Sequence, residues 1–289
     1  MGISFDGQCR ECFLRRNLAL VNSLGTQAQT AEFQAALERL MDSAPEEASS
    51  PWFAPHLAAL LQEHYGLELD RFREEKEESN RFVLERMELI REKVCSAPDP
   101  VFAGLQFAIL GNYIDFSALA GEVSYEKLEN MLSSALEMEL DGAVYADFCQ
   151  ELAVGKKLLY LTDNAGEIGF DRIFAEEIHK KYPHLEIVFC VRGGPANNDA
   201  TRADAAAVGI PFPVIDNGNR IPGTQLDALG QEARQAMDTA DVILAKGQGN
   251  AETLLGCGYN IYYAFLVKCV RFIQRYGKPK LTPMFVKER

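Results

Sequence analysis

Residues 158–167 read Leu-Leu-Tyr-Leu-Thr-Asp-Asn-Ala-Gly-Glu. A short apolar run therefore ends directly in a polar segment that contains a glycine, which is typical of a buried β-strand leading into a loop. Similar strand-like runs follow along the chain at 186–191, 212–215, 242–245 and 261–267.

Segments long enough for crossover helices lie between these runs, at 170–182, 199–208 and 224–239. This alternation predicts β-α-β units and a mainly parallel, buried sheet. We therefore expect residues 151–289 to form an α/β domain, an α/β/α sandwich with a Rossmann-like sheet. Residues 1–150 show helical apolar spacing instead and are expected to form an N-terminal helical bundle or cap domain. Within them, the charged stretch 70–81 is interpreted as the solvated face of a helix.

The composition of the chain restricts its possible partners. The 289 residues include 29 Lys and Arg against 42 Asp and Glu, which gives a formal charge of −13, and 47% are hydrophobic. This acidic balance argues against nucleic acid and anionic membranes as partners. No apolar run approaches the roughly 18–20 residues of a membrane helix, and no secretory signal pattern is seen at the start. We expect a globular cytoplasmic protein, and the oligomeric state stays open.

Seven cysteines are spread thinly along the chain and are expected to be reduced thiols. The pair Cys9-x-x-Cys12 has two interpretations. If the segment is helical, both thiols lie on one face and provide half of a thiolate metal site. Alternatively, they are two thiols packed at a seam between domains.

Polar residues follow four of the expected strands. In open α/β sheets, ligands bind beyond the carboxyl ends of the strands. Asp163, Asn164 and Asp199 follow two of these ends, and their short oxygen donors suit Mg²⁺ or Mn²⁺; the absence of His there disfavours Zn²⁺ and Cu²⁺. Lys246 precedes Gly-Gln-Gly, a pattern that resembles a phosphate cradle. Together these features indicate metal-assisted phosphoryl chemistry.

Each of these loops also has a structural interpretation. Asn164-x-x-Glu167 fits a capping box, and Asp199 fits a helix cap. Asp216-Asn-Gly-Asn219 is ordinary turn chemistry. The segment around Lys246 lacks the full P-loop pattern, and no dinucleotide fingerprint follows a strand.

Five segments, taken in order, resemble the motif series of the DUF89 family, the metal-dependent damage-control phosphatases related to the acidic-residue methyltransferase 1 (ARMT1)-like proteins. They are Thr162–Asp171, Asn198–Asp204, Asp216–Gly218, Pro222–Thr224 and Lys246–Leu254. Gly111–Phe116 and Cys9-x-x-Cys12 further resemble the small prokaryotic branch. The resemblance implies an α/β/α sandwich with an added helical domain, a divalent metal (Mn²⁺, Co²⁺, Ni²⁺ or Mg²⁺), and phosphate hydrolysis from small, damaged or side-product metabolites such as sugar phosphates.

The resemblance also implies roles for individual residues. The metal ligands are expected to be Asp163, Asn164 and Asp199, and the catalytic groups to be Asp163, Asp199 and Lys246. The residues expected to contact substrate are Lys246, Gly247 and Asn250 at the phosphate, Glu167 near the leaving group, and Asn198 and Asp216 at its periphery.

Two mechanisms are compatible with these residues. In the first, a metal-activated water attacks phosphorus while Lys246 and glycine amides stabilise the equatorial oxygens. In the second, Asp163 or Asp199 is the nucleophile. We favour water, because ligation to a metal makes either carboxylate a poorer nucleophile. Two other classes stay open: an S-adenosylmethionine-dependent carboxyl methyltransferase and a non-catalytic metal- or metabolite-binding protein.

Overall fold

A six-stranded sheet forms the centre of the computed structural model, which describes residues 2–115 and 123–288. The strand order is β3-β2-β1-β4-β5-β6, in which β1 to β5 run parallel and β6 runs antiparallel to β5. The strands are β1 (Lys157–Leu161), β2 (Glu186–Val191), β3 (Val214–Asp216), β4 (Val242–Lys246), β5 (Ile261–Leu266) and β6 (Pro283–Lys287). Because β1 to β5 point the same way, their carboxyl ends meet at one edge of the sheet.

Helices surround this sheet. In the described ranges they are α1 (Gly7–Val21), α2 (Gln27–Ser43), α3 (Phe53–Tyr65), α4 (Arg73–Leu84), α5 (Met87–Cys95), α6 (Pro100–Gly111), α7 (Tyr125–Ser133), α8 (Gly142–Val154), α9 (Glu167–Lys181), α10 (Arg202–Ala207), α11 (Gln231–Thr239), α12 (Gly247–Leu254) and α13 (Val270–Tyr276). Single 3₁₀ turns lie at Ser50–Trp52, Ala135–Glu137 and Leu226–Ala228. Across residues 2–115 and 123–288, every helix is too short or too polar to span a bilayer.

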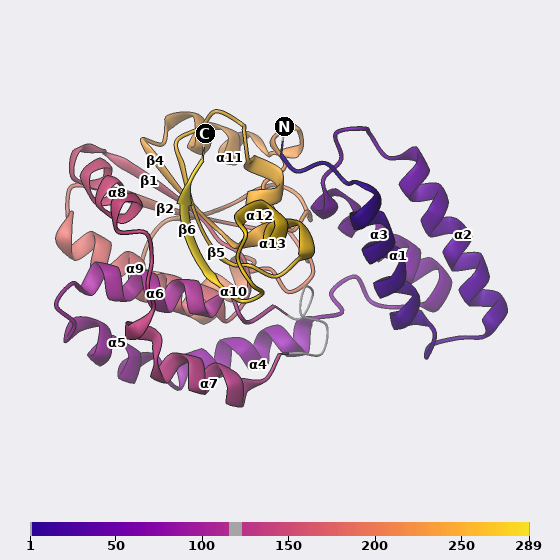
Figure 1. The fold of residues 1–289 in the computed structure, drawn as a ribbon, viewed down its shortest axis with the longest axis horizontal. Coiled ribbons are helices and arrows are strands. Elements are labelled where there is room, and N and C mark those ends of the chain that lie inside the picture. Colours follow the sequence, from indigo (N-terminus) through magenta and orange to yellow (C-terminus); the bar gives the residue numbers. More distant parts are fainter. Residues whose placement is uncertain (1, 116–122, 289) are drawn as a thin grey trace.

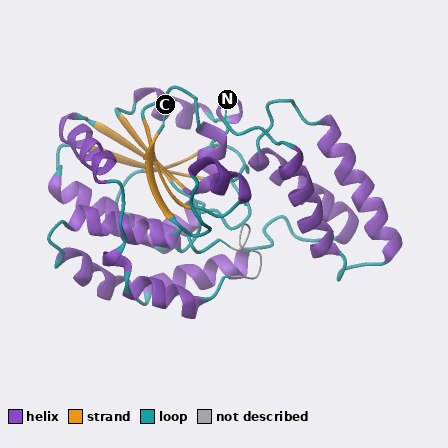
Figure 2. Ribbon diagram, viewed as in Figure 1, coloured by secondary structure: helices purple, strands orange, loops and turns teal. Residues whose placement is uncertain are grey.

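Successive side chains of each strand enter two different cores, because side chains alternate across a strand. On one face, Tyr160 of β1 stacks on Phe189 of β2 with ring centroids 4.6 Å apart, under helices α6 and α9. On the other face, Leu159 of β1 and Tyr263 of β5 pack against α11, α12 and α13. Figure 2 shows the strands enclosed between these helices. The predicted α/β/α sandwich with a mainly parallel sheet is confirmed.

The five predicted strands are present within one or two residues of their expected bounds, and β6 is an addition. This strand begins at a proline, pairs only with β5 and is partly exposed. An edge strand of this kind lacks the continuous apolar run by which a buried parallel strand is recognised.

Helices α1, α2 and α3 have a core of their own, which includes Phe33, Leu37 and Phe53. Figure 1 shows these three helices together beside the sandwich. Helices α4 to α8 share the core of the sheet instead; Phe148 of α8, for example, packs against Tyr262 with centroids 4.9 Å apart. The hydrophobic cores therefore divide the chain between α3 and α4, earlier than residue 150. The expected domain boundary at residue 150 stays a prediction.

The charged stretch 70–81 is not simply a solvated face. Lys76, Ser79 and Asn80 are buried, because α4 packs beside α9 and the start of α10. The Lys76 ammonium lies 2.9 Å from a carboxylate oxygen of Asp204. A charged stretch can therefore carry one buried ionic face, which periodicity of apolar residues does not reveal.

Candidate active site

The loop after β1 and the loop after β2 join at the carboxyl edge of the sheet. Ala200 N donates to the carbonyl oxygen of Asp163 over 2.7 Å, and Asn198 Nδ2 donates to Asn164 Oδ1 over 2.8 Å. Asn164 and Asp199 also form an isolated β-bridge. The structure therefore brings together Asp163, Asn164 and Asp199, the three predicted metal ligands, together with Asn198.

The Asp163 carboxylate is held on one oxygen by two amides. Oδ2 accepts from Asn112 Nδ2 over 2.8 Å and from Asn164 Nδ2 over 2.9 Å. Burial raises the pKa of Asp163 well above its usual range, and the negative charges of Asp199 and Glu167 raise it further. A cation bound beside these carboxylates would reduce the electrostatic repulsion among Asp163, Asp199 and Glu167.

Arg192 lies between the two aspartates and is completely buried. Its Nε donates to Asp199 Oδ2 over 2.7 Å, and its Nη2 lies 3.9 Å from Asp163 Oδ1. Burial raises the pKa of Asp199 to about 6, although the charge of Arg192 acts in the opposite direction. The Arg192 guanidinium therefore offsets only part of the negative charge of Asp163 and Asp199.

The donor chemistry fits a hard divalent cation. Two carboxylates and an amide oxygen are the ligand types that Mg²⁺ and Mn²⁺ prefer, and the Asn164 oxygen has a second lone pair besides the one used by Asn198. Within residues 2–115 and 123–288, no group of three or more His, Cys, Asp or Glu side chains is arranged to hold a metal ion. The candidate metal site at the carboxyl edge of the sheet instead has two carboxylates, Asp163 and Asp199, and one amide oxygen, that of Asn164.

Gly247 is required by the position of Asp163. Helix α12 begins at Gly247, directly after β4, where the sequence predicted an open phosphate-binding loop. The residue has a φ of +77°, and a Cβ added to it would lie 1.9 Å from Asp163 Oδ2. The carboxylate thus packs against the first turn of α12, where the backbone dipole favours negative charge.

Lys246 does not lie where the predicted phosphate contact requires it. Its fully buried ammonium donates to Ala108 O over 2.9 Å, to Glu167 Oε1 over 2.7 Å and to Asp171 Oδ1 over 2.5 Å. These bonds use all three donors of the ammonium. Two carboxylates on α9 therefore bind Lys246 inside the protein, which argues against the predicted contact between Lys246 and the phosphate.

The Lys246 network has shifted titration behaviour. Burial lowers the pKa of Lys246, but the charges of Asp171 and Glu167 outweigh this effect and the net change is upward. Burial raises the pKa of Asp171 to about 7 in spite of the nearby ammonium. Tyr160 also donates to Asp171 Oδ1, over 2.8 Å. Asp171 had no assigned role in the sequence analysis.

Glu167 closes the loop after β1. Its carboxylate accepts from Asn164 N over 3.3 Å, from Asn164 Nδ2 over 2.7 Å and from Asn112 Nδ2 over 3.0 Å. The side chain is fully buried. Only the bond from Asn164 N to Glu167 matches the capping box that the spacing Asn164-x-x-Glu167 allowed, because the N-cap of α9 is Gly166. The expected position of Glu167 near the leaving group stays a prediction.

Asn250 and Asp216 also differ from their predicted roles as substrate contacts. Asn250 is buried and donates to the carbonyl oxygens of Thr162 and Lys246, over 3.0 and 2.7 Å. Asp216 is the last residue of β3, the border strand of the sheet, and Arg202 Nε donates to its carboxylate over 2.6 Å. Asn250 therefore braces the loop after β1, and Asp216 belongs to a half-exposed ion pair beside the cluster.

Lys268 is a site residue that the sequence analysis missed. It follows β5, and its side chain is 1% exposed, with Nζ 2.7 Å from Asp115 Oδ2. Its charge lowers the pKa of Asp163, so the ammonium lies close to the candidate metal ligands. The position of Lys268 beyond the end of a fifth parallel strand was a usable signal, because the same reasoning selected the other four strand ends.

Helix α6 and the residues after it cover the site from the helical half. Asn112 bonds Asp163 and Glu167 through Nδ2, and its Oδ1 accepts from Leu266 N over 3.1 Å. The Gly111–Phe116 motif therefore reaches the cluster, although Phe116 itself lies outside the described residues. Cys9 and Cys12 are free thiols that contact Arg271 and Arg15.

The family model described as the damage-control phosphatase ARMT1-like domain matches residues 6–281. The chain therefore belongs to this family. It is 32% identical over 255 residues to a protein of Archaeoglobus fulgidus named damage-control phosphatase, with 85% of each chain covered. It is 35% identical over 180 residues, 61% of each chain, to the damage-control phosphatase PH1575 of Pyrococcus horikoshii. The crystal structure of PH1575, a DUF89 family protein, superposes with a TM-score of 0.83 at 27% identity and covers 99% of this chain and 100% of that one.

Proposed function

We propose that the chain is a metal-dependent phosphatase that hydrolyses phosphate monoesters of small metabolites, including damaged or side-product sugar phosphates. Family membership and the names of the relatives support this proposal. The observation that carries it is the meeting of Asp163, Asn164 and Asp199 at the carboxyl edge of the sheet. The chain's acidic balance and its free thiols further support a small-molecule substrate and a cytoplasmic location.

In this proposal, Asp163, Asn164 and Asp199 hold one divalent cation, with Mn²⁺, Co²⁺, Ni²⁺ and Mg²⁺ as the candidates. When bound, such a cation supplies Lewis acidity and activates water. Asn112 and Arg192 fix the two carboxylates through Asp163 Oδ2 and Asp199 Oδ2. Because those oxygens are already anchored, the geometry of the remaining oxygens is set before a ligand arrives.

Lys268 is proposed as the cation that meets the phosphate. Its ammonium has three donors, and in the described part of the chain only Asp115 accepts from it. Its side chain is buried and its charge lowers the pKa of Asp163, so an oxyanion bonded to it would interact with it at low dielectric. Lys246 instead balances the charges of Glu167 and Asp171 and so keeps the loop after β1 in place.

The test is phosphate release from p-nitrophenyl phosphate and from a panel of hexose phosphates, with each of the four metals in turn. We expect turnover that EDTA abolishes. The Asp163→Asn variant keeps the shape of the side chain and should lose turnover and Mn²⁺ binding by calorimetry. Asp216→Asn is the matched control, because Asp216 ends a parallel strand but pairs with Arg202 outside the cluster.

Two outcomes would contradict the proposal. Retained turnover in Asp163→Asn would remove Asp163 from the site. Metal and metabolite binding without phosphate release across the whole panel would favour a non-catalytic binding protein, and nucleoside binding without any need for metal would favour a methyltransferase.

A further inference from the structure

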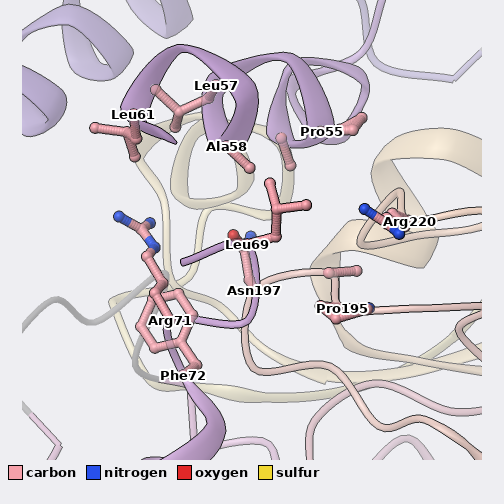
Figure 3. Close-up of a pocket in the computed structure, with 12 residues that line it drawn as sticks. Pro55, Leu57, Ala58, Leu61, Leu69, Arg71, Phe72, Pro195, Asn197 and Arg220 are labelled. Carbon is pink, nitrogen blue, oxygen red and sulfur yellow. The ribbon is translucent and has the colours of Figure 1, made fainter. Parts of the chain in front are cut away.

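A pocket lies where the N-terminal helical cluster meets the loop that leads into Asp199. Helix α3 contributes apolar side chains including Leu61, the segment 69–72 forms a wall, and residues 195–197 and Arg220 complete the lining (Figure 3). Consecutive Cα atoms are about 3.8 Å apart, so Asn197 lies within about 8 Å of Asp199 along the backbone. The pocket and the candidate metal site therefore share the loop 195–199.

Two arginines line this pocket without a counter-ion. Figure 3 shows Arg71 and Arg220 on opposite sides of Asn197. Neither forms an ion pair with a carboxylate within residues 2–115 and 123–288, although the chain has 42 acidic residues against 29 basic ones. Burial lowers the pKa of Arg71 and the charge of Arg16 lowers it further, whereas the charge of Glu75 acts in the opposite direction without reversing the shift. Positive charge has thus accumulated here in an acidic protein.

Asn197 gives a second sign of a ligand site. Its backbone has a φ of +49°, a left-handed conformation that is uncommon outside glycine. Figure 3 shows its amide between the two arginine-bearing walls. An amide in this place can both donate to and accept from hydroxyl groups, and backbone strain of this kind clusters at binding sites.

We propose that this pocket binds the non-reacting end of the substrate, and that this end carries a second oxyanion, either a carboxylate or another phosphate. The inference rests on the proposed phosphatase function and narrows its substrate class to esters with two anionic groups. The guanidinium fork matches the two oxygens of a carboxylate or phosphate, which gives strong, oriented hydrogen bonds. Arg71 is half-buried in the pocket wall, and Arg220 is exposed at the rim of the pocket.

The proposal extends to specificity. A singly anionic ester would fill the metal site but leave both arginines without a carboxylate or phosphate partner, as they are within residues 2–115 and 123–288 of the free protein. A doubly anionic ester would pair with them as well, and this added interaction would lower KM. Apolar side chains such as Leu69 and Phe72 cover the stem of the ligand between the two charges.

The experiment compares a hexose monophosphate, a hexose bisphosphate and a phosphorylated sugar acid on wild type, Arg71→Gln and Arg220→Gln. Arg39→Gln is the matched control, because Arg39 is exposed on α2 and the charge change is the same. We expect wild type to prefer one or both doubly anionic esters. Arg71→Gln should raise KM for them about tenfold, which is about 1.4 kcal/mol, and Arg220→Gln somewhat less. Arg39→Gln should hydrolyse every one of these esters with a KM within twofold of wild type.

A binding measurement separates this inference from the proposed function. Calorimetry in EDTA with the same phosphorylated sugar acid and bisphosphate should show binding to wild type that Arg71→Gln weakens about tenfold and Arg39→Gln leaves unchanged. If no ester is hydrolysed with any metal, the phosphatase proposal fails while this measurement still tests the pocket. No preference for a second anion, or equal behaviour of all three arginine variants, would overturn the inference.

Discussion

The ends of β4 and β5 lie side by side at one edge of the sheet, and each is followed by a buried lysine. Lys246, at the end of β4, uses all three ammonium donors on protein oxygens. Lys268, after β5, is bonded through Nζ to Asp115 alone in the described ranges. The difference teaches that burial by itself does not assign a role: a lysine whose donors are all used holds the fold, whereas one with donors to spare is available to an anion.

The largest expected effect is on the β4 side. Lys246→Met leaves Glu167 and Asp171 buried without their counter-ion, which typically costs about 3–5 kcal/mol. We expect the free energy of unfolding to fall by that amount in urea titrations of the metal-free protein. Lys268→Met should lose clearly less, because Asp115 is 12% exposed at its side chain and keeps access to water. Equal losses would break the comparison.

On the β5 side, the effect should appear in activity. Removing one preorganised donor from an oxyanion site costs about 10²–10³-fold in rate. We therefore expect Lys268→Met to lose about that factor in kcat/KM for p-nitrophenyl phosphate, and Lys268→Arg to recover part of it. Thermal melting would show that the variants remain folded. Unchanged kcat/KM in Lys268→Met would place the phosphate elsewhere.

A glycine pair sharpens the comparison at the β4 end. Gly247 and Gly256 have nearly the same φ, +77° and +76°, but an added Cβ meets Asp163 at Gly247 and open space at Gly256. Both alanine variants should therefore lose roughly 1–2 kcal/mol of stability from the left-handed backbone. Only Gly247→Ala should weaken Mn²⁺ binding, at least tenfold by calorimetry. Equal Mn²⁺ affinities would show that the start of α12 does not position Asp163.

The smallest effect concerns the partner of Lys246. The pKa of Asp171 is raised to about 7, so between about pH 4 and pH 7 the folded protein binds this proton and the unfolded chain does not. Stability of the metal-free protein should then fall as pH rises through that window, by at most about 1.4 kcal/mol per pH unit from this group. Asp171→Asn lacks the contribution, so its unfolding free energy should change less steeply between pH 5 and 7. Parallel slopes would show that Asp171 is ionised throughout.

The sheet and the convergence of the three candidate metal ligands could be predicted because both follow from local sequence. Buried parallel strands read as continuous apolar runs, and their ends must meet at one edge, which placed Asp163, Asn164 and Asp199 together. The same rule failed for Asp216, because β3 lies at the border of the sheet and Arg202 pairs with the carboxylate there. A position at a strand end therefore does not guarantee a place in the site, and Asn112 reaches the cluster from the end of helix α6 instead.

The remaining errors come from partners that are distant in sequence. The carboxylates that bind Lys246 come from α9, some 75 residues earlier, and the amide that caps Gly166 N comes from Asn80 on α4. The sequence pattern around a residue does not reveal contacts of this kind. In the same way, whether Lys268 has further acceptors besides Asp115 depends on which groups of the helical half reach the edge of the sheet.

The most direct test is a crystal soaked with Mn²⁺ and phosphate, examined by anomalous scattering. The account predicts one manganese peak in contact with oxygens of Asp163, Asn164 and Asp199, and a phosphate that bonds the Lys268 ammonium while Lys246 keeps its contacts with Glu167 and Asp171. A manganese peak elsewhere, no peak at all, or a phosphate bonded to Lys246 would contradict it.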